Sequence, residues 1–416
     1  MNARSIGVRA AALGLSLFVV LASVDLRPCT LAVCSGKATR DGRPLMWKNR
    51  DTSKVANKVL FFNGAKYKFL GLVDSDNVKG DEVYGGLNEA GFAIMNSQAD
   101  DLATPKKAGD GNGALMKLAL GECATAADFE ALLTREKGKF DLAANFGVID
   151  AAGGACFFET GSDRFVKFDA ADPRVAPFGY LVRTNFAFTS PDLLKGGGFI
   201  RFERISHIME RGRGENRLDV KFILRDASRD LIHEKLHSNP WTKELAADPA
   251  APLYINTNDT INRNTSVSAM VFHGAPAPEA ARLATMWVLL GQPIAAVALP
   301  LWVGGGGVPA VLTGPKTAPL NDLTRALVAF LYPDRRGRMP QYLNVNRLRA
   351  WGGEGVFAKL MRIEDEVLAR SGDRMADWEK SPPAPAEVAG FQEKLATWAY
   401  DSLKAAFPFL EEARGR

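Results

Sequence analysis

The stretch that decides the fold is CTLAVCSGKATRDGRPLMWKNRD, residues 29–51. It contains two runs with strand-like composition, residues 30–35 and 43–47, and the dipeptide Asp41-Gly42 lies between them. An Asp-Gly turn between two such runs is typical of a β-hairpin. We therefore predict that the chain from Cys29 onward begins with a hairpin, and that its second strand leads toward Asp51.

The segment before Cys29 has the pattern of a leader that is removed. Arg4 and Arg9 give it a positive start, residues 10–22 are apolar, and Val20 and Ala22 provide small residues at a cleavage position. The apolar run is shorter than the ~20 residues that a membrane-spanning helix needs. We predict a signal peptide over residues 1–22, a short propeptide over 23–28, and a secreted or periplasmic protein.

Removal of this leader would give Cys29 two reactive groups. A free α-amine has a pKa of about 7.7–8.0 and a thiol about 8.5, so the amine can take the thiol proton near neutral pH. Such a residue is an N-terminal nucleophile with its own base. The alternative is an ordinary secreted protein in which Cys29 forms half of a disulfide. Cys34 competes as nucleophile, but the odd spacing puts the two side chains on opposite faces of a strand.

Composition indicates a globular protein and excludes some classes of function. Hydrophobic residues make up 47% of the 416 residues and charged residues 24%, which is ordinary for soluble folds. The formal charge of +5 comes without a run of like charges, so nucleic-acid binding has no support. Four cysteines are too few for a disulfide scaffold.

A metal site is weakly indicated at most. His233 and His237 are four residues apart and would share a face of a helix, but no third ligand pattern lies near them. A surface pair is the favoured interpretation. We expect neither a metal ion nor a cofactor.

Hydrophobic patterning predicts many short strands and then a helical tail. Thr125 and Asp128 are spaced for a capping box at the start of one helix. Residues 287–312 are apolar and rich in Gly and Pro, and no internal repeat is found. Strands are expected over residues 30–35, 43–47, 59–63, 66–72, 92–96, 146–150, 156–160, 165–168, 180–184 and 266–273, and helices over 113–122, 126–136, 217–228, 321–331, 357–369 and 385–407. Strands mixed with helices in this order predict an α+β layered sandwich.

Several motifs together resemble one enzyme family. They are Cys29-Thr30, KNRD at 48–51, YGGLNEAGFAIMN at 84–96, ANFGVIDAAGGACFFE at 144–159, VRTN at 182–185, RFER at 201–204 and NTSVSAMVFH at 264–273. In this order they resemble N-terminal-nucleophile (Ntn) hydrolases of the acyl-coenzyme A:6-aminopenicillanate acyltransferase-like family. More distant relatives are choloylglycine hydrolases, penicillin V acylases and acid ceramidases. The resemblance spans residues 29–303 and implies an αββα sandwich. We assign the Ntn-hydrolase domain to residues 29–320 and a helical C-terminal extension to 321–416.

The resemblance also implies roles for residues near the start of the chain. Cys29 would be the nucleophile and, through its amine, the base. Asp51 stands where the family has an aspartate that orients the amine or thiol. Lys48 stands where the bile-salt and ceramide branches have an arginine; it keeps the charge but lacks the planar fork of a guanidinium. Arg50 is the alternative cation.

Three further site residues come from later motifs. Asn185 matches the asparagine that donates to the oxyanion, and Asn96 with a backbone N–H is the second donor candidate. Arg204, with Arg201 as the alternative, matches an active-site arginine. The resemblance implies an active site that needs no metal ion.

The implied function is that of a cysteine amidohydrolase or acyltransferase that cleaves a linear amide through a thioester. Its partner would be a small-molecule amide or acyl substrate, and we expect no nucleic acid and no stable membrane anchor. The sequence leaves open whether the protein forms an oligomer, and whether the reaction is hydrolysis or acyl transfer. One alternative is a non-catalytic secreted binding or structural protein that retains the Ntn fold. Another is a metal-dependent hydrolase that uses His233 and His237.

We expect the mature protein to begin at Cys29, because only a free α-amine can act as the base. Intact-mass analysis and N-terminal sequencing of the purified protein check this. A fully active enzyme that begins at Ser23 or earlier would contradict it. A Cys29→Ala protein that retains residues 23–28 would show that the chain cuts itself.

Overall fold

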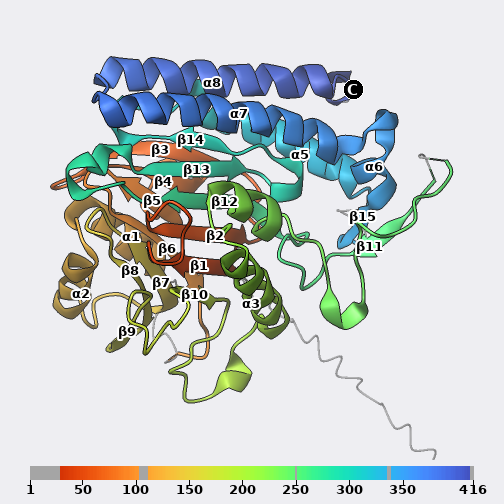
Figure 1. The fold of residues 1–416 in the computed structure, drawn as a ribbon. Coiled ribbons are helices and arrows are strands. Elements are labelled where there is room, and N and C mark those ends of the chain that lie inside the picture. Colours follow the sequence, from red (N-terminus) through yellow and green to blue (C-terminus); the bar gives the residue numbers. More distant parts are fainter. Residues whose placement is uncertain (1–28, 103–110, 249–250, 335–338, 413–416) are drawn as a thin grey trace, which may run out of the picture.

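The computed structural model describes residues 29–102, 111–248, 251–334 and 339–412. Two antiparallel sheets lie face to face at the centre of the molecule, with helices on both outer sides (Figure 1). This is the predicted α+β sandwich. The predicted signal peptide and propeptide, residues 1–28, lie outside the described residues.

The two sheets differ in how their strands follow the chain. The six-stranded sheet has the order β10-β1-β2-β12-β13-β14, so it combines the first strands with much later ones. The seven-stranded sheet runs β3 to β9 in chain order. The first sheet contains β1 (Thr30–Cys34), β2 (Leu45–Asp51), β10 (Tyr180–Arg183), β12 (Ser266–His273), β13 (Thr285–Leu290) and β14 (Leu299–Leu301). The second contains β3 (Asn57–Asn63), β4 (Lys68–Asp74), β5 (Gly85–Asn88), β6 (Ala93–Gln98), β7 (Ala143–Ile149), β8 (Ala155–Gly161) and β9 (Phe165–Asp169).

Helices cover the outer face of each sheet. α1 (Asn112–Glu122) and α2 (Ala126–Arg135) pack on the seven-stranded sheet around Phe129, which contacts the rings of Phe146 and Phe158. The other layer contains α3 (Phe199–Gly214), α4 (Val220–Phe222), α5 (Pro319–Leu331), α6 (Val345–Arg349), α7 (Gly355–Lys380), α8 (Pro385–Ala406) and α9 (Phe409–Glu412). A small separate sheet joins β11 (Tyr254–Asn256) to β15 (Tyr342–Asn344). No helix among the described residues is both long enough and apolar enough to cross a membrane.

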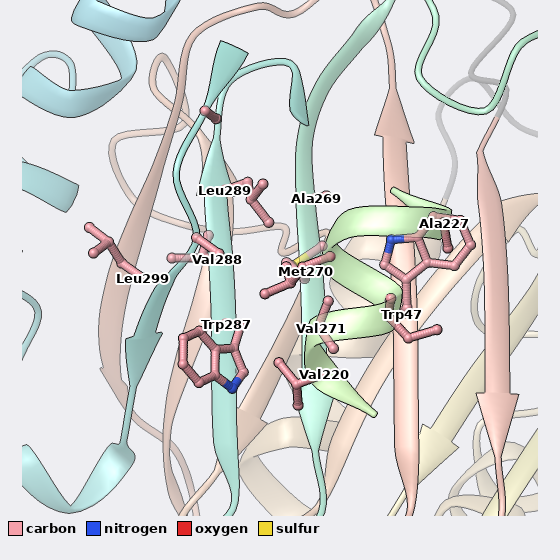
Figure 2. Close-up of a cluster of buried hydrophobic side chains, with 14 of the residues drawn as sticks. Trp47, Val220, Ala227, Ala269, Met270, Val271, Trp287, Val288, Leu289 and Leu299 are labelled. Carbon is pink, nitrogen blue, oxygen red and sulfur yellow. The ribbon is translucent and has the colours of Figure 1, made fainter. Parts of the chain in front are cut away.

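The predicted hairpin is confirmed. β1 and β2 pair antiparallel, with Leu31 opposite Lys48, and β2 continues to Asp51 instead of ending at Trp47. On the helix-covered face of this sheet, Trp47 and Val271 lie under α4 and the π-helical turn that follows it, which supply Val220 and Ala227 (Figure 2). These side chains are almost fully buried, so the sheet that carries Cys29 is held from this side by apolar packing.

The capping box is confirmed as well. Thr125 Oγ1 accepts from the Asp128 N–H at 3.1 Å, and the Asp128 carboxylate accepts from the Thr125 N–H at 2.9 Å. Local signals of this kind need no tertiary contact, which is why the sequence predicts them well.

Several elements differ from expectation. α3 was not expected, because its apolar residues are scattered among arginines and glutamates. β13 and β14 lie in the stretch 287–312, for which no element was expected; β13 is buried on both faces and therefore shows no alternation of polar and apolar residues. The helix expected over 217–228 is reduced to α4 and the π-helical turn Ile223–Ala227.

The C-terminal helices are attached to the sandwich by a buried ionic cluster. Glu364 on α7 is fully buried and accepts from Arg229 Nη1 at 2.9 Å and Arg225 Nε at 2.8 Å. The Ala298 N–H donates to its other oxygen at 2.9 Å. Every acceptor position of this carboxylate is therefore matched by a donor from the sheet-bearing part of the chain.

Glu364→Ala is expected to lower the free energy of unfolding by about 3–5 kcal/mol, because it leaves the Arg229 guanidinium buried without a counter-charge. Denaturant unfolding followed by circular dichroism measures this. Glu366→Ala is the matched control on the same helix; its carboxylate is exposed and pairs with Arg370, so a loss below ~1 kcal/mol is expected. Equal effects of the two changes would show that the buried cluster does not hold α7.

Candidate active site

The candidate site lies at one end of the six-stranded sheet. Because neighbouring strands run antiparallel, the end of β10, the start of β1, the end of β2 and the start of β12 meet at the same edge. This edge brings together Asn185, Cys29, Asp51 and Ser266, which are far apart in the sequence.

The backbone nitrogen of Cys29 is held by a side-chain amide. It donates to Asn185 Oδ1 at 2.8 Å, and Arg201 Nη2 donates to the same oxygen at 2.8 Å. Arg201 Nη1 donates to the Cys29 carbonyl at 2.6 Å and to Thr30 Oγ1 at 2.8 Å. Cys29 is thus clamped on both sides of its Cα, and its side chain is 5% exposed.

Arg201, the alternative arginine, contacts Cys29, and Arg204 does not. Arg204 lies three residues, about 4.5 Å, further along α3. It forms ion pairs with Asp230 at 2.6 Å and Glu234 at 2.8 Å. Gly198, immediately before the helix, has φ 82°, and a Cβ there would lie 2.4 Å from Arg201 Nη2. The arginine therefore reaches Cys29 across a position that only glycine can occupy.

Asn185 is oriented mainly as an acceptor. Its Oδ1 takes the two hydrogen bonds described above, and its Nδ2 donates to the Gln98 carbonyl at 2.9 Å. One amide hydrogen is thus directed at Gln98. The expected role in the oxyanion hole would have to use the other one.

Lys48 and Asn96 link the two sheets. Lys48 Nζ donates to Asn96 Oδ1 at 2.9 Å and to the Tyr84 carbonyl at 2.8 Å. An ammonium can only donate, so it fixes the Asn96 oxygen toward Lys48 and turns the amide N–H₂ the other way. Asn96 is therefore the better oriented oxyanion donor. Arg50, the alternative cation, forms an ion pair with Asp74 at 2.8 Å.

Asp51 is a buried carboxylate, and one of its two oxygens accepts a hydrogen bond. Its Oδ1 accepts from Ser266 Oγ at 2.6 Å, while Oδ2 has no hydrogen-bond partner among the described residues. Burial raises the pKa of Asp51 to about 6, against the opposing attraction of Arg263, Arg201 and Lys48. Arg263 was missed by the sequence analysis; it directly precedes the NTSVSAMVFH motif, but a single arginine before a strand gives no signal of its partner.

Cys29, Lys48, Asp51 and Asn96 border one small cavity of about 20 Å³. This space is enough for about one water molecule. Four of the six predicted site residues therefore border the same cavity. Asn185 does not border it but accepts a hydrogen bond from the nitrogen of Cys29, which does. Arg204 is paired with Asp230 instead.

The other cysteines are poor nucleophiles. Burial raises the pKa of Cys34, Cys123 and Cys156 to about 12 each. Their thiols stay protonated at neutral pH, and a protonated thiol is unreactive. No cysteine among the described residues is in a disulfide.

The histidine pair differs from expectation. His233 is buried and its Nδ1 accepts from the Leu236 N–H at 3.3 Å, whereas His237 is exposed in a left-handed conformation. They do not form the surface pair that was favoured. Among the described residues no group of three or more His, Cys, Asp or Glu side chains is placed to bind a metal ion.

Asp51→Asn is expected to alter the pH dependence of stability. The folded state prefers the neutral Asp51 because its pKa is raised, so this contribution is complete below pH ~4 and is lost as pH rises through about 6. The amide has no charge to bury. The unfolding free energy of Asp51→Asn relative to wild type should therefore rise by on the order of 2–3 kcal/mol between pH 3.5 and 7. Urea unfolding at both pH values measures it, and a difference independent of pH would contradict the raised pKa.

No family model and no curated protein matches this chain. Among solved structures, the chain is similar to a mutant of the conjugated bile acid hydrolase from Clostridium perfringens, with 10% identity, a TM-score of 0.38, and coverage of 63% of this chain and 89% of that one. It is similar to the penicillin V acylase from Agrobacterium tumefaciens at 14% identity and TM-score 0.38, covering 66% and 86%. It is also similar to the N-acylethanolamine-hydrolyzing acid amidase ortholog of Caenorhabditis elegans at 15% identity and TM-score 0.38, covering 63% and 100%.

Proposed function

We propose that this protein is a cysteine amidohydrolase or acyltransferase that cleaves a linear amide through Cys29. The observation that carries the proposal is the hydrogen bond from the Cys29 nitrogen to Asn185 Oδ1 at 2.8 Å, beside a cavity bordered by Lys48, Asp51 and Asn96. A site that positions the backbone nitrogen of a cysteine with a dedicated amide side chain is suited to use that nitrogen as a base.

The first step joins the Cys29 sulfur to the substrate carbonyl carbon. The thiol proton moves to the α-amine, and the carbonyl oxygen becomes an oxyanion that Asn96 Nδ2 stabilises. Asn185 Oδ1 accepts one amine N–H, which turns the single lone pair of the amine away from Asn185 and leaves it available for that proton.

Collapse of the tetrahedral intermediate breaks the carbon–nitrogen bond. The ammonium of Cys29 returns the proton to the leaving nitrogen, which departs as the amine, and a thioester remains. Water then attacks the thioester carbon and gives a proton to the α-amine. The carbon–sulfur bond breaks, the acid leaves, and the ammonium returns the proton to the Cys29 sulfur; an acceptor amine in place of water gives acyl transfer. Atoms and protons balance without a cofactor.

The charges around the nucleophile favour the anionic intermediates. Lys48, Arg201 and Arg263 all act on Asp51, and Asp259 also acts on Arg201. Burial lowers the pKa of Arg201 to about 10, so it still carries its charge at neutral pH. The excess of cations stabilises both a thiolate and an oxyanion in a site shielded from water.

Processing and export form part of the proposal. The amine can act only after the segment 1–28 is removed, and the leader pattern supports export to the periplasm or the medium. In the described structure Asn185 and Arg201 already hold Cys29, so the site needs no later rearrangement of these two residues.

Cleavage of chromogenic acyl amides tests the proposal, and Asn185→Asp is its sharpest variant. A carboxylate keeps the acceptor for the Cys29 nitrogen but adds a negative charge, which raises the pKa of the amine. The acidic limb of kcat/KM should move to higher pH, while Cys29→Ala should abolish turnover. Asn258→Asp, at an exposed position, is the charge-matched control.

An unchanged acidic limb in Asn185→Asp would show that the base is not the Cys29 amine. Full activity of Cys29→Ala would reject Cys29 as the nucleophile.

A further inference from the structure

Asn112 borders the small cavity at Cys29 and carries an acceptor that no donor meets. It is the first residue of α1, is 1% exposed, and lines the cavity together with Cys29 and Asn96. Its Oδ1 is buried and has no hydrogen-bond partner among the described residues. A buried acceptor without a donor costs free energy, so such an oxygen beside a nucleophile indicates that the donor belongs to a ligand.

A chain of hydrogen bonds fixes the orientation of the Asn112 amide. Asn112 Nδ2 donates to Gln98 Oε1 at 2.9 Å, and Gln98 Nε2 donates to Asp100 Oδ1 at 3.0 Å. An ionised carboxylate can only accept, so Gln98 keeps its N–H₂ toward Asp100 and its oxygen toward Asn112. Asn112 must then donate to Gln98, and its oxygen cannot exchange places with its nitrogen. The unpaired acceptor is therefore a fixed feature of the site.

The acceptor is held by the same sheet that carries the oxyanion donor. The Gly111 N–H, just before α1, donates to the Asp141 carbonyl at 2.8 Å, which attaches the start of the helix. Gln98 belongs to β6 and follows Asn96 by two residues, so the two side chains lie on the same face of that strand. Both line the cavity, and Gln98 in turn holds Asn112. The positions of the acceptor and the oxyanion donor are thus set together.

A single amide group matches the donor and the acceptor at this cavity. The cavity measures about 20 Å³, roughly the space of one water molecule, so the groups that border it lie within reach of one small polar group. A secondary amide has a carbonyl oxygen that accepts and an N–H that donates. With its carbon at the Cys29 sulfur, its oxygen accepts from Asn96 Nδ2 and its N–H donates to Asn112 Oδ1. An ester has an oxygen in place of the N–H and would bring two acceptors together.

Asp51 Oδ2 is a second acceptor at this cavity that lacks a hydrogen-bond partner among the described residues. Three cationic side chains act on its carboxylate, and the family resemblance gives it the amine or thiol of Cys29 to orient. Asn112 is a neutral amide that the mechanism above does not use. This leaves Asn112 as the acceptor for the substrate.

We propose that Asn112 Oδ1 accepts the N–H of the scissile amide, and that the site thereby selects primary and secondary amides over tertiary amides and esters. The inference rests on the proposed function and specifies its substrate class. The same hydrogen bond holds the leaving nitrogen in place. Because its N–H faces Asn112, the lone pair that this nitrogen gains in the tetrahedral intermediate is directed away from Asn112 and can take the proton of the Cys29 ammonium.

The experiment uses the processed full-length protein with p-nitroacetanilide and p-nitrophenyl acetate, which differ only in the N–H or oxygen at the scissile bond. Asn112→Leu keeps nearly the size of the side chain and removes the acceptor. The ratio of kcat/KM for the anilide to kcat/KM for the ester should fall by roughly 10- to 100-fold, the usual effect of leaving a buried N–H unpaired. Asn112→Asp keeps an acceptor oxygen and should keep the ratio close to that of the wild type.

Asn346→Leu is the matched control. It removes a buried amide near the start of another helix, α6, where Asn346 Nδ2 donates to the Ala251 carbonyl at 2.7 Å. Its ratio should equal that of the wild type, and thermal unfolding checks that all variants fold. A ratio that Asn112→Leu leaves unchanged, or that Asn346→Leu lowers equally, overturns the proposal.

Binding separates this inference from the proposed function. Cys29→Ala is titrated calorimetrically with N-butylphenylacetamide and with its N-methyl derivative, which has no N–H. The first should bind about tenfold more tightly or better, and adding Asn112→Leu should remove most of the difference. The comparison in Cys29→Ala alone needs no change at Asn112, so it decides the matter even where Asn112→Leu does not fold.

Tighter binding of the N–H amide, with no turnover by the wild type, would reject the amidase proposal and keep the acceptor role of Asn112. Equal binding of the two amides, or no binding of either, overturns that role even if the enzyme is active.

Discussion

The carboxamide oxygen of Asn185 is the contact on which the site depends. It accepts from the nitrogen of Cys29 and from Arg201 at 2.8 Å each, so it joins the residue just before β1 to the segment that follows β10 and to the helix α3. Arg201 completes the link by donating to the Cys29 carbonyl. After the proposed removal of the leader, Cys29 would have no preceding chain to hold it. These side-chain bonds would then replace that restraint and fix where its sulfur and amine lie relative to the sheet edge.

A buried site with more cations than carboxylates is costly unless it binds negative charge. Lys48 and Arg201 are both almost fully buried, and the pKa of Asp51, the carboxylate on which both act, is raised to about 6 by burial. In the proposed mechanism, a thiolate or an oxyanion would improve this charge balance. The stability lost in the ground state would then be regained in the transition state, which is the usual condition for electrostatic catalysis.

The C-terminal helices belong to the same physical unit as the strands. Glu364 of α7 is held by Arg229 and by the backbone of Ala298, and Thr324 of α5 donates to the Leu290 carbonyl at the end of β13. α5 and the ends of β12 and β13 border a cavity of about 780 Å³. The small cavity at Cys29 is separate from it and is lined by residues 29–113.

The sequence alone determined the features that depend on neighbouring residues. The Asp41-Gly42 turn gives the hairpin, the Thr125–Asp128 pair gives a helix start, and the motif order predicts the αββα sandwich. The role of Cys29 as the nucleophile stays a prediction. Only the tertiary structure decided which partners those residues meet. Arg201 rather than Arg204 reaches Cys29, Lys48 turns the Asn96 amide from the opposite sheet, and Arg263 approaches Asp51. Spacing along the chain carries no information on such contacts, because they depend on strand order, on the position of each residue along its helix, and on the distance between the sheets.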